Sequence, residues 1–112
     1  MNLTPAERAG ERGGATMVIE FLTFRIDPDD RAEWLSHEEH HWSRFLEQQD
    51  GFVSKQMWAP VDDPTTVHAV IWWESEDHWK SIPRDELDAV AAAMGPHERE
   101  PTMTAYHVIR EC

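Results

Sequence analysis

The run His37-Glu38-Glu39-His40-His41 is the part of the sequence that most directly suggests chemistry. Histidines four residues apart lie one turn apart on a helix, where both rings can bind one metal ion. A glutamate directly after the first histidine completes the HExxH pattern of zinc proteases, in which it acts as the base. His37 and His41 are therefore candidate metal ligands, with Glu38 in the base position. The candidates for a third ligand are His68, His78, His97 and His107. The alternative is that the helical wheel turns both histidines toward solvent, away from the core.

Tryptophan is unusually frequent, with six copies in 112 residues. Large aromatic side chains are enriched in ligand sites and interfaces as well as in cores. Adjacent strand residues point to opposite faces, so only one of Trp72 and Trp73 can face the helices. With Trp42 and Trp79, and with Phe45 beside them, that indole would form an aromatic wall suited to a planar ligand. The alternative is that these rings are ordinary core.

Acidic residues beside this aromatic wall are candidate general bases. Glu38 or Glu39, if buried against the indoles, would have a raised pKa and could accept a proton. Exposure to solvent is the alternative for either side chain. Two further charged residues, Glu20 and Lys55, fall inside apolar strands, either as a buried pair or as substrate-binding groups.

Two histidines, His68 and His107, fall inside predicted strands. A strand histidine in a pocket can shuttle protons near neutral pH or bind haem iron. The alternative is a structural histidine held by a hydrogen bond.

Six elements must position these side chains. Alternating apolar residues predict strands over 17–26, 52–59, 67–74 and 104–110. Asp27-Pro28 begins a helix that should run to about Gln49, with Leu35, Glu39, Trp42 and Leu46 inward and Trp34 at the edge. Ser75 begins a second helix, which Pro83 interrupts and Gly95-Pro96 ends. The order predicts an α+β, ferredoxin-like βαββαβ domain: a four-stranded antiparallel sheet with two helices on one face.

The first and third predicted strands are apolar on both faces. Two helices cover only one face of such a sheet, so the other face must meet another surface. The simplest partner is the same face of a second copy, and we therefore predict a homodimer.

Charge and composition exclude some partners. The formal net charge is −12, from 22 acids against 10 bases. This charge argues against nucleic acid and anionic membranes, since both attract Lys and Arg. The sequence has one cysteine, Cys112, no bilayer-spanning apolar run and no signal-peptide core, so we expect a cytoplasmic protein. Residues 1–16 lack hydrophobic periodicity and are predicted to be a flexible tail, with one domain over 17–112.

Several short strings resemble a known group. They are Val18-Ile19-Glu20, Trp42, Gly51-Phe52 with Lys55 and Trp58, Trp73-Glu74-Ser75, and Trp79-Lys80-Ser81-Ile82-Pro83. Together they resemble the dimeric α+β barrel superfamily, whose best-known branch is antibiotic-biosynthesis-monooxygenase-like. They are most similar to a small uncharacterised family with a WES…WKSIP signature.

The resemblance implies a dimer whose two sheets face each other, with each pocket between a sheet and its own helices. Members of the superfamily include cofactor-independent oxygenases of aromatic polyketides, haem-degrading enzymes, and cyclases or isomerases. The haem-degrading relatives carry a histidine on the second helix, where residues 87–94 of this chain contain none.

The leading hypothesis is a small-molecule enzyme of this group. It would oxygenate, isomerise or cyclise an aromatic or polyketide-like metabolite. The predicted catalytic residues are Glu38, His68 and His107. The predicted ligand-binding residues are Trp42, Trp72, Trp73, Trp79 and Phe45. We expect no cofactor, because no flavin or nucleotide fingerprint is present, so an oxygenase would use the substrate's own carbanion to activate oxygen. The alternatives are a non-catalytic ligand-binding dimer, or a metal or haem protein that uses His37 and His41 or other histidines.

Overall fold

A computed structural model describes residues 16–112 of the chain. Its four strands are β1 (Val18–Arg25), β2 (Phe52–Trp58), β3 (Thr66–Trp73) and β4 (Thr102–His107). They form one antiparallel sheet in the order β2-β3-β1-β4. The predicted tail falls outside the described residues except for Thr16, which is exposed.

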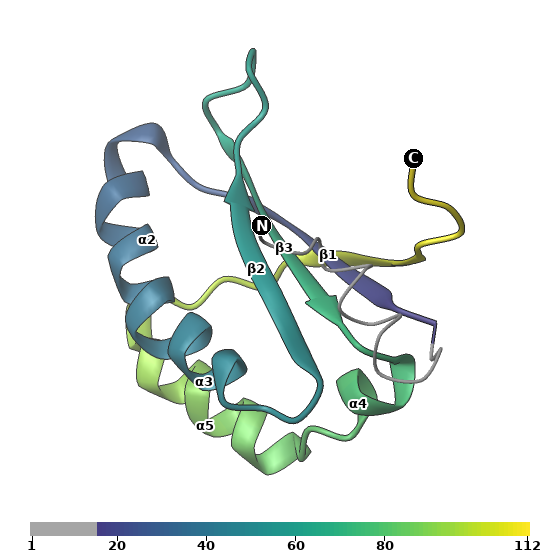
Figure 1. Cartoon of the computed structure of the whole chain (residues 1–112). Coiled ribbons are helices and arrows are strands. Elements are labelled where there is room, and N and C mark those ends of the chain that lie inside the picture. The colour runs from purple at the N-terminus through teal and green to yellow at the C-terminus, as the bar shows by residue number, and fades with distance from the viewer. Residues whose placement is uncertain (1–15) are drawn as a thin grey trace.

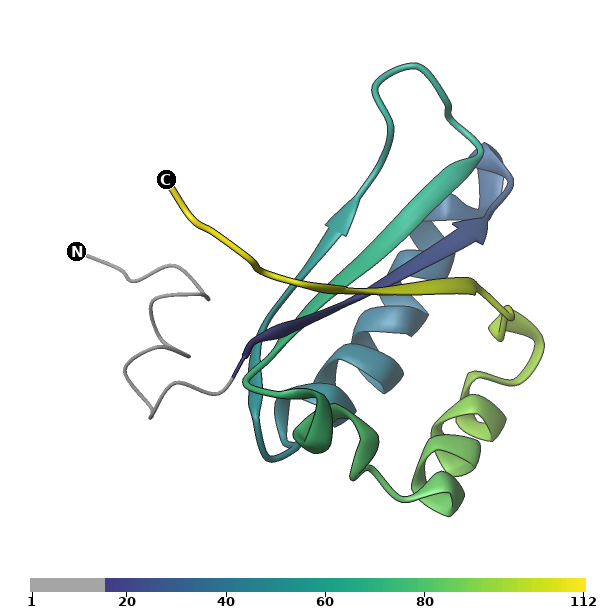
Figure 2. The same ribbon diagram turned by 90° about the vertical axis from the view of Figure 1, so that its right-hand side faces the viewer.

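The helical segments occupy one side of this sheet. Between β1 and β2 a short helical turn η1 (Pro28–Asp30) leads into α2 (Arg31–Glu38), a π-helical turn η2 (Glu39–Ser43) and α3 (Arg44–Glu47). Between β3 and β4 lie α4 (Glu76–Lys80), α5 (Arg84–Met94) and the turn η3 (Gly95–His97). Figure 1 shows α2, α3 and α5 on the same side of the sheet, and Figure 2 shows the sheet from its edge. The predicted α+β ferredoxin-like class, with a four-stranded antiparallel sheet and helices on one face, is confirmed.

Both helical segments begin at the predicted caps. The Asp27 carboxylate accepts a hydrogen bond from the Asp29 amide, with Pro28 at the first helical position. The Ser75 hydroxyl oxygen accepts one from the His78 amide. Pro83 then separates α4 from α5, because its ring cannot continue the preceding helix.

The inward stripe of the first helix differs from the prediction at three residues. Trp34 is buried rather than at the edge, and Glu38 is buried whereas Glu39 is exposed. The π-helical turn adds a residue to one turn of η2, so a uniform helical wheel drawn across it has the wrong phase. Glu38 thereby faces the sheet.

The core lies between the helices and the inner face of the sheet. Val18 and Phe24 from β1 pair with Trp73 and Val67 from β3, and all four are buried there.

The opposite face of the sheet carries a row of aromatic residues with little cover. Trp58 on β2 is 44% exposed and Tyr106 on β4 is 51% exposed. In residues 16–112 no helix is long and apolar enough to cross a membrane.

Candidate active site

A cavity of about 480 Å³ lies between the inner face of the sheet and the helical layer. β1, β2 and β3 supply its floor, α2, η2 and α3 one side, and α4, α5 and the segment before β4 the other. This volume is within the range of small-molecule sites, about 300–1,000 Å³. The cavity is therefore large enough for a ligand of several fused rings.

Glu38 and Lys55 form an ion pair at the floor of the cavity. The Lys55 ammonium donates to Glu38 Oε2 and also to Ser43 Oγ, at 2.7 Å. The Ser43 hydroxyl in turn donates to Glu38 Oε1 at 2.9 Å. The π-helical turn brings Ser43 to this position, five residues after Glu38, so both carboxylate oxygens of Glu38 accept hydrogen bonds.

Glu20 lies on the same face of the sheet, two strands from Lys55. Both residues are paired in register with Ile71 on the intervening strand β3, so their side chains project from neighbouring positions. Burial raises the pKa of Glu20, while hydrogen bonds from the indoles of Trp73 and Trp79 and the charge of Lys55 oppose that rise. Burial likewise lowers the pKa of Lys55, against the favourable charge and hydrogen bond of Glu38. Two acids and one base thus share a poorly hydrated floor.

Aromatic and aliphatic side chains form the walls above this floor. Trp42 lies on one side, with its indole Nε1 donating to Glu98 Oε1 at 3.1 Å. Trp79 lies on the other side, with Ile82 and Leu87. The rim is charged, and consists of Arg84, Asp88, Glu98, Arg99 and Glu100. An apolar ligand with a few polar groups fits such a lining better than a highly charged one.

Three predicted site residues line this cavity together: Glu38, Trp42 and Trp79. Trp73 faces the helices but is completely buried beneath the cavity, where its Nε1 donates to Glu20 Oε1 at 3.2 Å. Trp72 points to the opposite face of the sheet, with its ring 6.3 Å from that of Trp58. The two adjacent indoles therefore take opposite faces, but neither belongs to the wall around the cavity.

The other predicted residues lie elsewhere. His68 is on the open face of the sheet, with Nδ1 3.1 Å from Thr23 Oγ1 and its ring 4.6 Å from that of Phe21. His107 is exposed at the end of β4 and does not line the cavity. Phe45 packs edge-on against Trp42 and on the core without lining the cavity.

Glu38 of the HExxH pattern faces away from the two histidines. The Glu38 side chain points into the cavity toward Lys55, whereas the rings of His37 and His41 lie 6.3 Å apart and parallel outside it. His37 is closer to His97, at a ring distance of 3.8 Å. A glutamate on the core side of the helix cannot act as the base for a metal on its outer side.

The sequence prediction chose neither Glu20 nor Lys55 as a site residue. The signal was available, because each is a lone charge in an otherwise apolar strand, and such a charge needs a buried partner or a function. The partners of each depend on the fold, since Glu38 is 17 residues from Lys55 and Trp73 is 53 residues from Glu20.

Comparison with known families agrees with this architecture. The model of the antibiotic biosynthesis monooxygenase family matches residues 17–82, which are 66 of the 112 residues. The chain belongs to this family. No curated protein sequence matches it significantly.

Several solved structures of this family's fold are similar. The monooxygenase ActVA-Orf6 of Streptomyces coelicolor, in complex with nanaomycin D, is 20% identical over 87% of this chain and 91% of its own, with a TM-score of 0.65. SnoaB of Streptomyces nogalater, a cofactor-independent oxygenase, is 19% identical over 88% and 96%, with a TM-score of 0.61. A haem-degrading protein of Mycobacterium tuberculosis is 20% identical over 88% and 98%, with a TM-score of 0.63. At these identities the similarity shows the fold alone.

Haem does not suit the cavity described above. Protein ligands to haem iron are histidine, cysteine, methionine or tyrosine side chains. None of these residue types is among the described residues that line the cavity.

Proposed function

We propose that the protein is a cofactor-independent oxygenase of a small aromatic or polyketide-like molecule, with the cavity as its active site. The observation that carries this proposal is the charged set Glu20, Lys55 and Glu38 under an aromatic-walled cavity. A planar ligand would lie between Trp42 and Trp79, with an acidic C–H or O–H group directed to the floor.

Glu20 is the proposed base. Its raised pKa favours taking a proton from a weak acid, because a base is most effective when its pKa is close to the working pH. Glu38 is less available for this role, since its carboxylate is ion-paired with the Lys55 ammonium.

Lys55 is the proposed electrostatic group. Its ammonium at the cavity floor would stabilise the oxyanion that forms when the substrate loses a proton, and this effect is large where water is excluded. Glu38 would hold the ammonium in place and keep it charged against the burial that lowers its pKa. Glu38 therefore acts through Lys55.

The chemistry balances with oxygen as the oxidant. Glu20 removes a proton from a substrate methylene flanked by a carbonyl group, which leaves an enolate. The enolate carbon gives electrons to O2 and forms a C–O bond, and the resulting peroxide takes up a proton to become a hydroperoxide. Loss of water then converts the original CH2 into C=O, with one oxygen atom of O2 in the product and one in water. The description of SnoaB as cofactor-independent supports such a route.

The test is oxygen uptake with anthrone, a tricyclic ketone with an acidic methylene, as the probe. Wild-type protein should consume O2 and form the quinone, whereas Glu20→Gln should lose at least about a hundredfold in rate, the scale of a general base. The control is Glu39→Gln, which changes the same charge at an exposed position beside Glu38 and should retain the wild-type rate. Equal rates for wild type and Glu20→Gln would refute the assignment. Binding without oxygen uptake would instead indicate an isomerase or a ligand-binding protein.

We further propose that the protein is a homodimer through the open face of the sheet. Phe21, Trp58, Trp72 and Tyr106 form contiguous ring contacts on this face. An aromatic surface of this kind is typical of an interface. Trp58→Glu should convert the dimer into a monomer in light scattering, and a wild-type monomer at micromolar concentration would contradict the proposal.

A further inference from the structure

A cluster of metal-binding side chains lies on the side of α2 turned away from the active-site cavity. Glu33 and His37 are one turn apart on α2, and His97 comes from η3, sixty residues later. Each of the three offers one ligand atom, and these atoms all lie within 4.8 Å of one another. The rings of His37 and His97 are nearly parallel, with centroids 3.8 Å apart.

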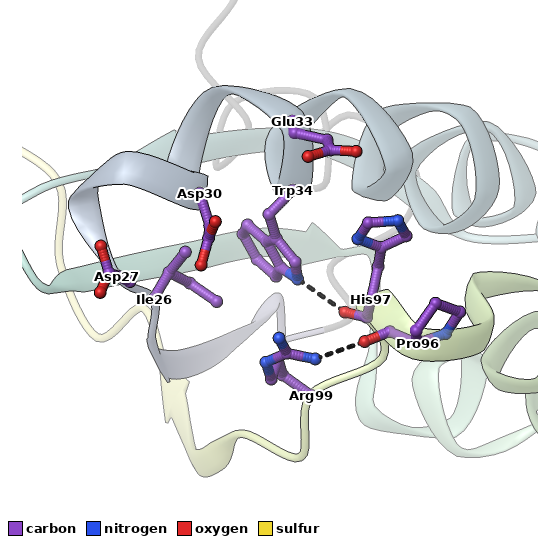
Figure 3. A pocket seen from close by; sticks show the side chains of 8 residues that line it. All are labelled: Ile26, Asp27, Asp30, Glu33, Trp34, Pro96, His97 and Arg99. Carbon is purple, nitrogen blue, oxygen red and sulfur yellow. Dashed lines mark hydrogen bonds between the residues drawn. The ribbon is translucent and has the colours of Figure 1, made fainter.

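The backbone that carries His97 is held in place by a buried side chain. The indole Nε1 of Trp34, which is 3% exposed, donates to the His97 carbonyl oxygen at 3.0 Å (Figure 3). Trp34 directly follows Glu33 on α2. The same helix therefore supplies two of the three ligands and fixes the position of the third. Metal binding would not need to order a flexible loop.

The surroundings favour a cation. A hollow of about 190 Å³ beside the cluster is lined by Glu33 and His97 and by the carboxylates of Asp27 and Asp30, with Arg99 opposite (Figure 3). Arg99 donates to the carbonyl oxygens of Pro96 and Glu98, so its charge is directed partly to the backbone. The formal net charge of the whole chain, −12, adds to the attraction.

We propose that Glu33, His37 and His97 bind a divalent transition metal, with Zn²⁺ the best match. Two imidazoles and a carboxylate are a ligand set that zinc uses, with the fourth position left to water. Ligand distances of about 2.0–2.2 Å place tetrahedral ligand atoms roughly 3.3–3.5 Å apart. Side-chain rotations can bring the three groups from their present spacing to this one, since Glu33 is exposed and both histidines are partly exposed.

The metal would join two parts of the fold that border the active site. Residues 98–101, which follow His97 directly, line the cavity, and Glu98 accepts the hydrogen bond from Trp42. Metal binding would fix the start of this segment to α2. The metal site is independent of the proposed oxygenase chemistry, because none of its three metal-binding side chains lines the active-site cavity.

The experiment is calorimetric titration of tag-free, chelator-treated protein with Zn²⁺ alone. Cys112→Ser serves as the background, so that the terminal thiol cannot bind the metal. We expect one Zn²⁺ per chain. His97→Ala should weaken binding by more than about tenfold, since losing even outer-shell partners of a metal costs 10- to 100-fold. Glu33→Gln, at an exposed position that leaves folding intact, should weaken it as well.

Two histidine variants serve as controls on the same helical segment. His40→Ala removes an exposed histidine outside the cluster and should leave zinc affinity unchanged. His41→Ala tests the competing HExxH pair and should also leave it unchanged. Absence of stoichiometric binding would overturn the proposal. It would equally be overturned if His97→Ala bound as tightly as wild type, or if His41→Ala lost as much affinity as His97→Ala.

Discussion

Replacing Lys55 by methionine tests the charge arrangement under the cavity. The substitution keeps the length of the side chain but removes the ammonium that bonds Glu38 and Ser43. The side chains of Lys55 and Glu38 are only 7% and 5% exposed, so Glu38 would be left as a buried carboxylate without its counter-charge. Removing one partner of a buried ion pair costs about 3–5 kcal/mol of unfolding free energy. Because the Ser43 hydroxyl would still donate a hydrogen bond to Glu38, we expect the lower end, about 3 kcal/mol.

The double variant Lys55→Met, Glu38→Gln separates the loss of a charge from the loss of packing. The glutamine retains an acceptor for the Ser43 hydroxyl but no longer carries a buried charge. The free energy of unfolding of the double variant should recover to within about 1 kcal/mol of wild type, since replacing both partners of a buried ion pair by uncharged residues is often close to neutral.

The assay is urea unfolding followed by tryptophan fluorescence, with the free energy of unfolding obtained by linear extrapolation. Glu39→Gln is the control and should lie within about 0.5 kcal/mol of wild type, as surface substitutions do. The reasoning is refuted if Lys55→Met costs less than about 1 kcal/mol. A double variant no more stable than the single one would refute it as well.

Three further predictions concern single positions. Gly51 has φ +82°, and a Cβ there would lie 2.3 Å from His78 Cγ, whereas Gly95 has φ +57° and nothing lies within 4 Å of a Cβ at that position. Gly95→Ala should therefore cost only the backbone strain, about 1–2 kcal/mol of unfolding free energy, and Gly51→Ala should cost more. Equal urea midpoints for the two variants would contradict this. Hydrogen bonds from Thr66 and Thr65 lower the pKa of Asp63 from 3.8 to about 2, so the stabilisation that this carboxylate provides is present above pH 3.8 and is lost as the pH falls toward 2. The difference in urea midpoint between wild type and Asp63→Asn should therefore shrink over that interval, and a constant difference would argue against it. Because burial raises the pKa of Glu20 above 4.5, its contribution to stability is greatest below pH 4.5 and declines as the pH rises through the folded-state pKa. Glu20→Gln should remove this decline, which the same unfolding series from pH 4 to neutral would detect.

The fold was predictable because local signals agreed with one another. Asp27-Pro28 and Ser75 cap the helices where expected, and Pro83 divides the second helical segment. The alternation of the apolar strands fixed which face each residue takes, including the opposite directions of Trp72 and Trp73. Such signals act over a few residues and need no knowledge of tertiary contacts.

The site was only partly predictable, for two physical reasons. The π-helical turn at Glu39–Ser43 shifts the phase of the helix, and no sequence rule located it. It decides that Glu38 rather than Glu39 faces the cavity, and it places Ser43 beside Lys55. The second reason is that the decisive contacts are distant in sequence.

Histidine pairing illustrates this second reason. The spacing of His37 and His41 suggested a pair on one helix, and the structure instead places His97 closest to His37. That contact depends on the hydrogen bond from Trp34 to the backbone of His97, between residues 63 positions apart. A helical wheel describes only the residues of one helix, so it could not identify this partner.

The most direct test of the proposed active site is anaerobic stopped-flow mixing of the protein with anthrone. Without oxygen the reaction stops at proton removal, so absorbance of the enolate reports the action of the base alone. Wild type and Glu39→Gln should form the enolate in proportion to occupied sites, and Glu20→Gln should form almost none. Enolate formation by Glu20→Gln at the wild-type rate and amplitude would contradict the assignment of Glu20 as the base in this cavity.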